Sequence, residues 1–399
     1  MKTGAGYFAA IALTLVAICS CNQDPIFFTI SRETAPLEPL IKGSPTNMVR
    51  FIHNGVDGFF VASKQLYRYT GGSWNYSGPQ PSGRVIALAA TANYLYAVCI
   101  TGDMDRTLRR LKNDGTNWET IPFDAGGSPM IQSIYADPDP VSKRLFVGTG
   151  NTDPFAIWHI HDDDGDAKLK LLINETKYLS GAAFDGSNYY LSTRDIVGKG
   201  GGIFMVDFGG GPDIELLESP GGENKNLQII GMIKLEDGTI IAVERDGGAF
   251  FEVGTGGIER RGIATGGWAT GALAIWEHPH DVEKPKNETR KLLVAGIQGG
   301  LYNTTTSSYT HGYVEFDLES SDGSLIGSRR DPGILDTIYG DHDQDRYKAT
   351  IGKHPINHLF QVPGDIDSNM TFFASTKNVG LWSYRERPRD GGWQWNAEN

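Results

Sequence analysis

The sequence predicts an all-β protein that repeats one strand unit several times, and three observations lead to this prediction. Glycine makes up 51 of the 399 residues, against an average usage of about 7%, and it comes as doublets between apolar runs, as expected of many tight turns. Short runs of Val, Ile, Tyr and Phe recur from residue 48 onward, where no apolar spacing of 3.6 residues extends over three turns. The third observation is that these runs share one internal pattern.

The repeated unit is a strand in which a small residue follows large apolar ones, then a turn and a second, aromatic-rich strand. Seven copies align on the small residue, at positions 62, 97, 148, 192, 242, 295 and 374. These positions are 35, 51, 44, 50, 53 and 79 residues apart, and a four-stranded propeller blade takes about 40 to 50 residues. One twisted blade cannot cover its two apolar faces, so blades stack into a closed ring. The sequence therefore predicts a seven-bladed β-propeller.

Each copy supplies the middle hairpin of a blade. The seven hairpins are Phe59–Ala62 with Leu66–Tyr69, Leu95–Val98 with Leu108–Leu111, Leu145–Gly148 with Ala156–Trp158, Tyr190–Ser192 with Ile203–Val206, Ile240–Val243 with Ala249–Phe251, Leu292–Ala295 with Leu301–Tyr302, and Phe372–Ala374 with Leu381–Tyr384. Five copies are preceded by a run suited to an innermost strand: Val85–Ala89, Ile131–Ile134, Leu179–Phe184, Ile229–Ile233 and Ala272–Ile275. Small residues in these runs would let the blades approach closely at the axis. We expect Ala62, Ala242, Ala295 and Ala374 to be equivalent and to face a neighbouring blade.

The longest interval and the two ends decide how the ring closes. An insertion occupies about Thr306–Pro355, with Tyr313–Leu318 as the outer strand of its blade and a polar excursion over Ser328–Lys353; the alternative is an eighth, degenerate blade. Trp393–Trp395 is predicted to be the outermost strand of the last blade. We expect the ring to close by packing, with the strand-prone segment Ile26–Ile30 as an added strap. Pairing of that segment beside the last blade is the alternative.

The N-terminus has the pattern of a secretory signal, with Lys2 followed by an apolar stretch too short to span a bilayer. Ile18-Cys19-Ser20-Cys21 resembles the bacterial lipobox, although Cys19 replaces the more usual small residue. The resemblance implies cleavage after Ser20 and lipid attachment at Cys21, with acyl chains such as palmitate as the membrane anchor. An ordinary secretory signal cleaved near the same place is the alternative. The predicted domains are a signal peptide over 1–20, a lipidated tether or strap over 21–47, and the propeller over 48–399.

Three turns carry a further resemblance. Gly71–Trp74, Asn113–Trp118 and Asp390–Trp393 look like degenerate Asp-box turns of sialidase-type propellers. In those turns an acidic or amide side chain caps the hairpin, glycine is left-handed and the aromatic residue packs between blades. Asn113 takes the place of the aspartate and Tyr69 stands at the acidic position of the first copy. The role that the resemblance implies is structural.

Charge and motif spacing exclude some functions. The chain has 36 basic and 48 acidic residues, a formal charge of -12 and no run of Lys or Arg, so nucleic acid is not an expected partner. A sialidase would need three arginines, a tyrosine and a carboxylate meeting at one site. Arg50-Phe51-Ile52 begins like that family's Arg-Ile-Pro element but lacks the proline. Arg194 and Arg245 follow apolar strands by similar offsets, so both could reach one end of the ring.

Two acidic clusters have the ligand spacing of a calcium site. Their alternating carboxylates are Asp162, Asp164 and Asp166, and Asp341, Asp343 and Asp345. Neither cluster is an EF-hand loop, because Ala167 and Arg346 replace the sixth-position glycine. The first cluster lies in a hairpin turn, where Asp is favoured for backbone capping alone. We expect no cofactor and no catalytic residue, with calcium as a candidate metal.

These observations favour a lipid-anchored, non-catalytic propeller that acts as a binding scaffold in the bacterial cell envelope. The expected partner is an envelope protein or a glycan, the expected state is a monomer, and contact with the membrane is expected through the lipid alone. A scaffold without a recognisable nucleophile, base and orienting residue carries this interpretation. The alternative is an exported sialidase-like or other glycan-processing propeller enzyme.

Overall fold

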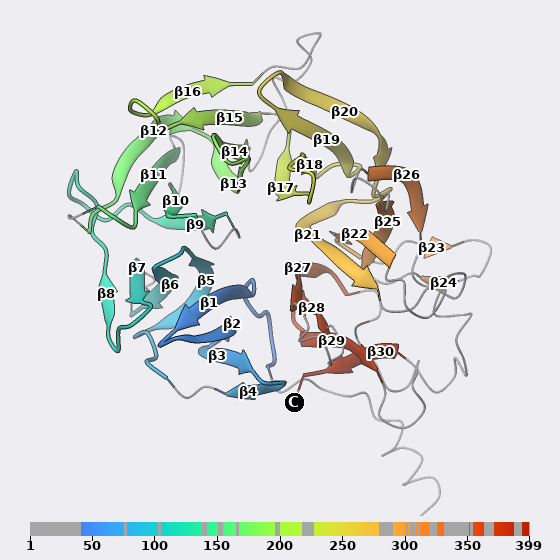
Figure 1. Ribbon diagram of the computed structural model, residues 1–399, viewed down its shortest axis with the longest axis horizontal. Helices are drawn as coiled ribbons and strands as arrows, with labels where there is room; N and C mark the ends of the chain where they lie inside the picture. Colours follow the sequence, from blue (N-terminus) through green and yellow to red (C-terminus); the bar gives the residue numbers. More distant parts are fainter. Residues whose placement is uncertain are drawn as a thin grey trace, which may run out of the picture.

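Seven four-stranded antiparallel sheets follow one another around a ring in the computed structural model (Figure 1), and the prediction of an all-β, seven-bladed β-propeller is confirmed. The structure describes residues 41–75, 78–102, 105–137, 142–150, 155–164, 167–195, 200–217, 227–278, 290–299, 302–303, 308–309, 312–318, 325–330, 351, 354–362, 371–386 and 393–398. In these ranges no helix has the length and apolar character needed to cross a membrane.

Each blade is contiguous in the sequence, and its strands run in chain order from the centre of the ring to the rim (Figure 1). Blades 1 to 3 consist of β1 (Val49–His53), β2 (Val56–Ser63), β3 (Gln65–Thr70) and β4 (Ser73–Asn75); β5 (Arg84–Ala90), β6 (Tyr94–Thr101), β7 (Asp105–Lys112) and β8 (Trp118–Thr120); and β9 (Ile131–Ala136), β10 (Arg144–Thr149), β11 (Phe155–His161) and β12 (Lys170–Thr176). Blades 4 and 5 consist of β13 (Tyr178–Phe184), β14 (Tyr189–Arg194), β15 (Gly201–Asp207) and β16 (Asp213–Leu216); and β17 (Ile229–Lys234), β18 (Ile240–Glu244), β19 (Ala249–Gly254) and β20 (Gly257–Ala264). Blades 6 and 7 consist of β21 (Ala269–His278), β22 (Arg290–Ile297), β25 (Tyr313–Leu318) and β26 (Leu325–Arg330); and β27 (Ile356–Val362), β28 (Thr371–Thr376), β29 (Gly380–Glu386) and β30 (Trp393–Ala397).

The second strand of a blade is buried on both faces. In β6 the five residues Leu95–Cys99 are all buried, and in β28 all six residues are buried. A strand with one face in water would alternate between buried and exposed residues. Continuous burial therefore shows that each blade is covered by both of its neighbours.

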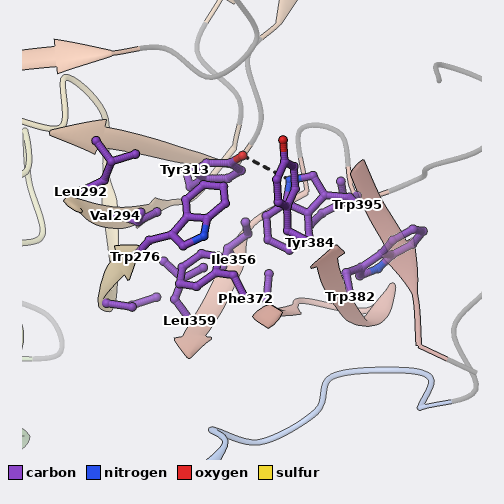
Figure 2. Close-up of a cluster of buried hydrophobic side chains, with 14 residues drawn as sticks. Trp276, Leu292, Val294, Tyr313, Ile356, Leu359, Phe372, Trp382, Tyr384 and Trp395 are labelled. Atoms are coloured by element: carbon purple, nitrogen blue, oxygen red, sulfur yellow. Dashed lines mark hydrogen bonds between the residues drawn. The ribbon is translucent and has the colours of Figure 1, made fainter. Parts of the chain in front are cut away.

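Seven clusters of buried apolar side chains fill the seven interfaces between blades. Figure 2 shows the cluster between blades 6 and 7, where the rings of Trp276 and Phe372 stack at 4.6 Å with an angle of 7° between their planes. In the same cluster Trp395 Nε1 donates a hydrogen bond of 3.2 Å to Tyr313 Oη. The hydrophobic core is thus divided into layers, one between each pair of neighbouring blades. Each blade is held in the ring by the apolar layers on its two faces.

Near the axis, short polar side chains tie the innermost strands together. Ser133 Oγ donates to the carbonyl of Leu179 at 2.8 Å, and Ser180 Oγ donates to the carbonyl of Ile229 at 2.6 Å. At the next interface glycine replaces the serine: a Cβ on Gly231 would lie 2.3 Å from the carbonyl oxygen of Gly271. The prediction that small residues let the blades approach at the axis is confirmed.

A strap of residues 41–46 lies between the first and last blades. The amide of Leu381 in blade 7 donates to the carbonyl of Ile41 at 3.0 Å, and the amide of Thr46 donates to the carbonyl of Ala62 in blade 1 at 2.8 Å. In the described residues the sheet of blade 7 consists of its own four strands, in agreement with closure by packing. Ile26–Ile30 lies outside the described residues.

The sixth blade differs from the prediction. Leu292–Ala295 belongs to β22, whose partner is β25 rather than Leu301–Tyr302. Strand β25 is the third strand and not the outer one, because β26 pairs beside it and includes Ser328. Tyr302 instead belongs to β23 (Tyr302–Asn303), which pairs with β24 (Ser308–Tyr309) in a separate hairpin. This hairpin lengthens the interval, and because blade 6 packs directly on blade 7, the alternative of an eighth blade is wrong.

The predicted equivalence of four alanines holds for three of them. Ala242, Ala295 and Ala374 are fully buried and pack in the clusters toward the preceding blade. Ala62 is also fully buried but packs toward the following blade. A shift of one residue reverses the face of a strand, so the alignment of the first copy is displaced by an odd number of residues.

The predicted glycine turns are only partly as expected. Gly71 and Gly72 between β3 and β4 are left-handed, with φ of 56° and 80°, which glycine adopts without steric cost. Gly115 is not left-handed, and Trp118 is half-buried at the interface of blades 1 and 2, where its Nε1 donates to the carbonyl of Pro79 at 2.8 Å. The turn residues Asp390–Gly392 lie outside the described residues.

Candidate functional site

Two pockets lie where the innermost strands meet. The larger, of about 700 Å³, is lined mainly by β1, β5, β9 and β27, and most of its wall is apolar. The smaller, of about 150 Å³, is polar and is lined by blades 3 to 6. We call the smaller one the arginine pocket; its wall includes Tyr135, Tyr178, Arg194, Arg245, Thr270 and Gln298.

The antiparallel order of strands in a blade places these residues at one end of the ring. Arg194 is the last residue of β14, Arg245 follows β18 and Gln298 follows β22. Tyr178 and Thr270 stand at the beginning of innermost strands, which pair with those second strands in the opposite direction. The ends of second strands and the starts of first strands of three successive blades therefore converge on the arginine pocket.

The Arg194 guanidinium stacks on an aromatic ring. Its Cζ lies 4.8 Å from the ring centre of Tyr178, within the range of a cation–π interaction. The Tyr178 hydroxyl donates to the carbonyl of Gln132 at 3.3 Å. These contacts hold both side chains of the pair in the wall of the pocket.

Arg245 is oriented by its neighbour. Its Nε donates to Asp246 at 2.9 Å, and within the described part of the chain its two terminal nitrogens make no hydrogen bond. Near Arg194, Lys177 Nζ lies 3.9 Å from Asp195 Oδ2, which is a weaker ion pair. The pocket thus presents two guanidinium groups, while the nearby carboxylates stand outside its wall.

Tyr135 contributes a second phenol. Burial raises the pKa of Tyr135 above its usual value; Tyr178 adds to the rise and Arg194 opposes it. Tyr135 therefore stays protonated near neutral pH and keeps a hydroxyl that can donate. The arrangement of two phenols and two guanidiniums suits an anionic or strongly hydrogen-bonding ligand.

The structure separates the three arginines considered from the sequence. Arg194 and Arg245 reach one end of the ring, as predicted, and share one pocket. Arg50 lines the larger pocket and pairs with Asp57, with Nη2 to Oδ2 at 2.6 Å. The arginine pocket thus contains two of the three arginines that a sialidase would need.

The carboxylates of Asp162 and Asp164 accept hydrogen bonds from different parts of the fold. Asp162 is buried and accepts hydrogen bonds from Thr91 Oγ1 at 2.7 Å and from the amide of Asn93 at 3.0 Å, which ties the turn after β5 to blade 3. Burial raises the pKa of Asp162, against the effect of these hydrogen bonds. Asp164 instead accepts from Lys170 Nζ at 3.0 Å.

The remaining predicted site residues lie outside the described residues. These are Cys21, Asp166, Asp341, Asp343 and Asp345. Among the described residues, no three His, Cys, Asp or Glu side chains are grouped as a metal site would require. Calcium binding therefore stays a prediction.

Sequence reasoning did not identify Tyr135, Tyr178 or Gln298. Tyr178 and Gln298 stand at strand ends, as the two arginines do, so an alignment of strand ends rather than of small residues would have detected them. Tyr135 lies within β9, and no spacing distinguishes it from a core tyrosine.

Comparisons with known proteins support the fold alone. No family model and no curated protein matches the chain. Among solved structures, an extracellular domain from B. thetaiotaomicron (BT4673) is 12% identical with a TM-score of 0.51, and the match covers 90% of this chain and 47% of that one. Virginiamycin B lyase from Staphylococcus aureus is 12% identical (TM-score 0.48, 86% and 97% covered), and YCF48 bound to D1 peptide is 13% identical (TM-score 0.46, 87% and 93% covered). At this identity, the chain is similar to these proteins in being a β-propeller.

Proposed function

We propose that the protein is a lipid-anchored, non-catalytic binding scaffold of the bacterial cell envelope and that it binds its partner, a protein or a glycan, at the arginine pocket. The observation that carries this proposal is the convergence of Arg194 and Arg245 from two neighbouring blades on one polar pocket. Convergent polar groups in a concave site are the usual sign of a ligand site. The propeller holds these groups on strand ends that are fixed by the inter-blade layers, so little ordering is needed on binding.

The composition of the pocket favours binding over catalysis. Its wall carries guanidinium, phenol, hydroxyl and amide groups, and in the described residues it contains no carboxylate or imidazole. General acid–base catalysis most often uses an imidazole or a carboxylate, and among the described residues of the wall the phenols of Tyr135 and Tyr178 are the usual acid–base groups present. The pocket is therefore better suited to hold a ligand than to move its protons.

The anchor and the location are proposed from the N-terminal sequence. The lipobox-like segment ending at Cys21 supports export and lipidation, and two or more acyl chains would hold the domain at a membrane surface. The propeller then faces the envelope as a monomer and contacts the membrane through its lipid.

One observation favours a second candidate function, a glycan-processing enzyme. Tyr135 and Tyr178 line the same pocket as the two arginines, and a tyrosine beside arginines is part of what a sialidase-like reaction requires. Release of reducing sugar from envelope glycans by the purified protein, abolished by Tyr135→Phe or Tyr178→Phe, would favour this candidate over the scaffold.

The proposal is tested in two steps with the full chain. Wild type should incorporate labelled palmitate and fractionate with membranes, whereas Cys21→Ala should stay unprocessed or become soluble. Membrane partition and loss of the first 20 residues in Cys21→Ala would contradict the anchor.

The second step tests the pocket. Wild-type protein in detergent should retain an envelope component that Arg194→Gln with Arg245→Gln loses, while Arg260→Gln, on outermost strand β20 of the same blade as Arg245, retains it. Equal retention by all three would contradict binding at the arginine pocket. The protein used must keep residues 41–46, because they join blades 1 and 7.

A further inference from the structure

The backbone of an exposed tryptophan adjoins the wall of the arginine pocket. Trp268 is 61% exposed, the largest exposed apolar side chain in the described residues. It precedes Ala269, a residue of the pocket wall, and its carbonyl accepts a hydrogen bond of 2.8 Å from the amide of Gln298, another wall residue. An indole that is left in water beside a polar pocket is a sign of ligand contact.

The backbone that carries Trp268 is fixed. Thr265 in the same loop is fully buried, and its amide donates to the carbonyl of Gly248 at 3.0 Å. On the other side of Trp268, the amide of Ala269 donates to the carbonyl of Arg245 at 3.1 Å. Backbone hydrogen bonds on both sides of Trp268 therefore fix the main chain from which its indole projects, close to the main chain of Arg245.

The size of the pocket limits what enters it. Its volume of about 150 Å³ is below the ~300 to 1,000 Å³ of pockets for drug-sized ligands. The pocket holds one small polar unit, and the rest of a longer ligand extends over the surface beside it, where Trp268 lies.

The groups present specify the chemistry of that unit. Arg194 and Arg245 supply planar cationic forks, which match a carboxylate. Tyr135 and Gln298 supply neutral hydrogen-bonding groups of the kind that pair with hydroxyls. The flat, exposed indole of Trp268 offers an apolar surface, and a sugar ring has an apolar C–H face with hydroxyls at its edge.

We propose that the arginine pocket and Trp268 together bind a carboxylate-bearing sugar residue of an acidic glycan. The inference rests on the proposed function, since it names the ligand class of the same site. The carboxylate lies between Arg194 and Arg245, and the adjoining sugar ring stacks on Trp268. A run of Asp or Glu residues would use the arginines equally well but has no ring face for the indole, so the observations favour the sugar.

Titration calorimetry with the full-length Cys21→Ala protein tests the inference with four probes. Trigalacturonate and sialyllactose carry the two common kinds of sugar carboxylate, galactotriose is the neutral control and triglutamate is the peptide control. We expect at least one acidic sugar to bind about tenfold or more tightly than galactotriose and triglutamate. Binding of either acidic sugar supports the inference, and the one that binds identifies the source of the carboxylate.

Matched variants test the residues. Arg194→Gln, Arg245→Gln and Trp268→Ala should each weaken binding of the acidic sugar about tenfold, and Arg194→Lys should fall between Arg194→Gln and wild type. Arg260→Gln and Leu216→Ala remove an exposed arginine and an exposed leucine from outermost strands and should leave affinity unchanged. Thermal melts equal to that of wild type show that a loss of binding does not come from unfolding.

The outcomes separate this inference from the proposed function. If neither acidic sugar binds but arginine-dependent retention of an envelope component persists, the sugar inference is wrong and the scaffold proposal stands. If galactotriose or triglutamate binds as tightly as the acidic sugars, the inference is overturned. If arginine-dependent retention also fails, both are wrong.

Discussion

The indole N–H of Trp74, in the outermost strand of the first blade, donates a hydrogen bond to the carboxylate of Glu398, just beyond the outermost strand of the last blade. Glu398 is only 3% exposed, and it also accepts a hydrogen bond from Ser383 Oγ. Its backbone amide donates to the carbonyl of Leu381 at 3.1 Å. The two ends of the ring are thus joined at the rim by one buried carboxylate, in addition to the strap of residues 41–46.

Replacing Glu398 with alanine should therefore loosen the closure. The substitution leaves the donors of Trp74 and Ser383 without their partner, which costs about 1 to 3 kcal/mol for a buried group. Urea unfolding of Glu398→Ala should give a free energy of unfolding that is lower than that of wild type by this amount. Trp74→Phe keeps an aromatic ring but removes the indole N–H, so the double variant should be less destabilised than the sum of the two single variants.

Enlarging the buried alanines should strain the inter-blade layers. Ala242→Leu, Ala295→Leu and Ala374→Leu each add three carbons to a fully buried site, and overpacking of this kind costs ~1 to 3 kcal/mol. Ala62→Leu should cost a similar amount although it faces the other neighbour. Thermal melts measure the effect.

The exposed pair of Lys112 and Asp114 provides the control for this series. Their atoms Nζ and Oδ2 lie 3.1 Å apart, with side chains 54% and 69% exposed, and such pairs contribute little to stability. Asp114→Ala should melt like wild type. Wild-type melting of the leucine variants together with a collapse of Asp114→Ala would contradict the assigned register.

The protein should lose stability in acid through His159. Burial, together with the nearby Arg144 guanidinium, lowers the pKa of His159 from 6.5 to about 4, and Arg144 Nη1 lies 3.2 Å from His159 Nδ1. The unfolded chain takes up a proton below pH 6.5 and the folded chain only near pH 4. The contribution is thus fully present above pH 6.5 and is lost as the pH falls from 6.5 to 4, by up to about 3 kcal/mol. Urea unfolding across this range should be less pH-dependent in His159→Gln, and an unchanged slope would contradict the assignment.

Cys99 should be unreactive in the folded protein. It is fully buried between blades 1 and 2, and burial raises the pKa of its thiol to about 11, against the effect of Arg109. Thiolate is the reactive form, so iodoacetamide at pH 8 should modify Cys99 only as fast as the domain opens. In a chain with Cys19 and Cys21 replaced by alanine, rapid labelling without denaturant would show that the site is open.

The sequence was sufficient to predict the blades because their pattern is local. Second strands such as Leu95–Cys99 are buried on both faces and therefore consist of continuous apolar runs, which are visible in the sequence alone. The prediction of the hairpin in the sixth copy was wrong because the two strands of that hairpin are not close in the sequence. An inserted hairpin places Tyr302 where a partner strand is expected, and the true partner, Tyr313–Leu318, follows the insert.

The candidate site was less predictable because it is assembled from four blades. Arg194 and Arg245 were recognised by their place after apolar strands, which indicates the end of the ring but not their neighbours. Tyr135 and Tyr178 reach the same pocket as the arginines only because they lie on β9 and β13, the innermost strands of two neighbouring blades. The exposure of Trp268 is a tertiary property that no periodic pattern in the sequence indicates.

A crystal structure of the protein with an acidic trisaccharide, trigalacturonate or sialyllactose, tests the account most directly. We expect a sugar carboxylate at about 2.7 to 2.9 Å from nitrogens of Arg194 and Arg245, with a sugar ring against the indole of Trp268. A trisaccharide bound in the larger pocket beside Phe360 would contradict this binding mode. So would crystals in which neither trisaccharide occupies the arginine pocket at concentrations that saturate other proteins that bind acidic glycans.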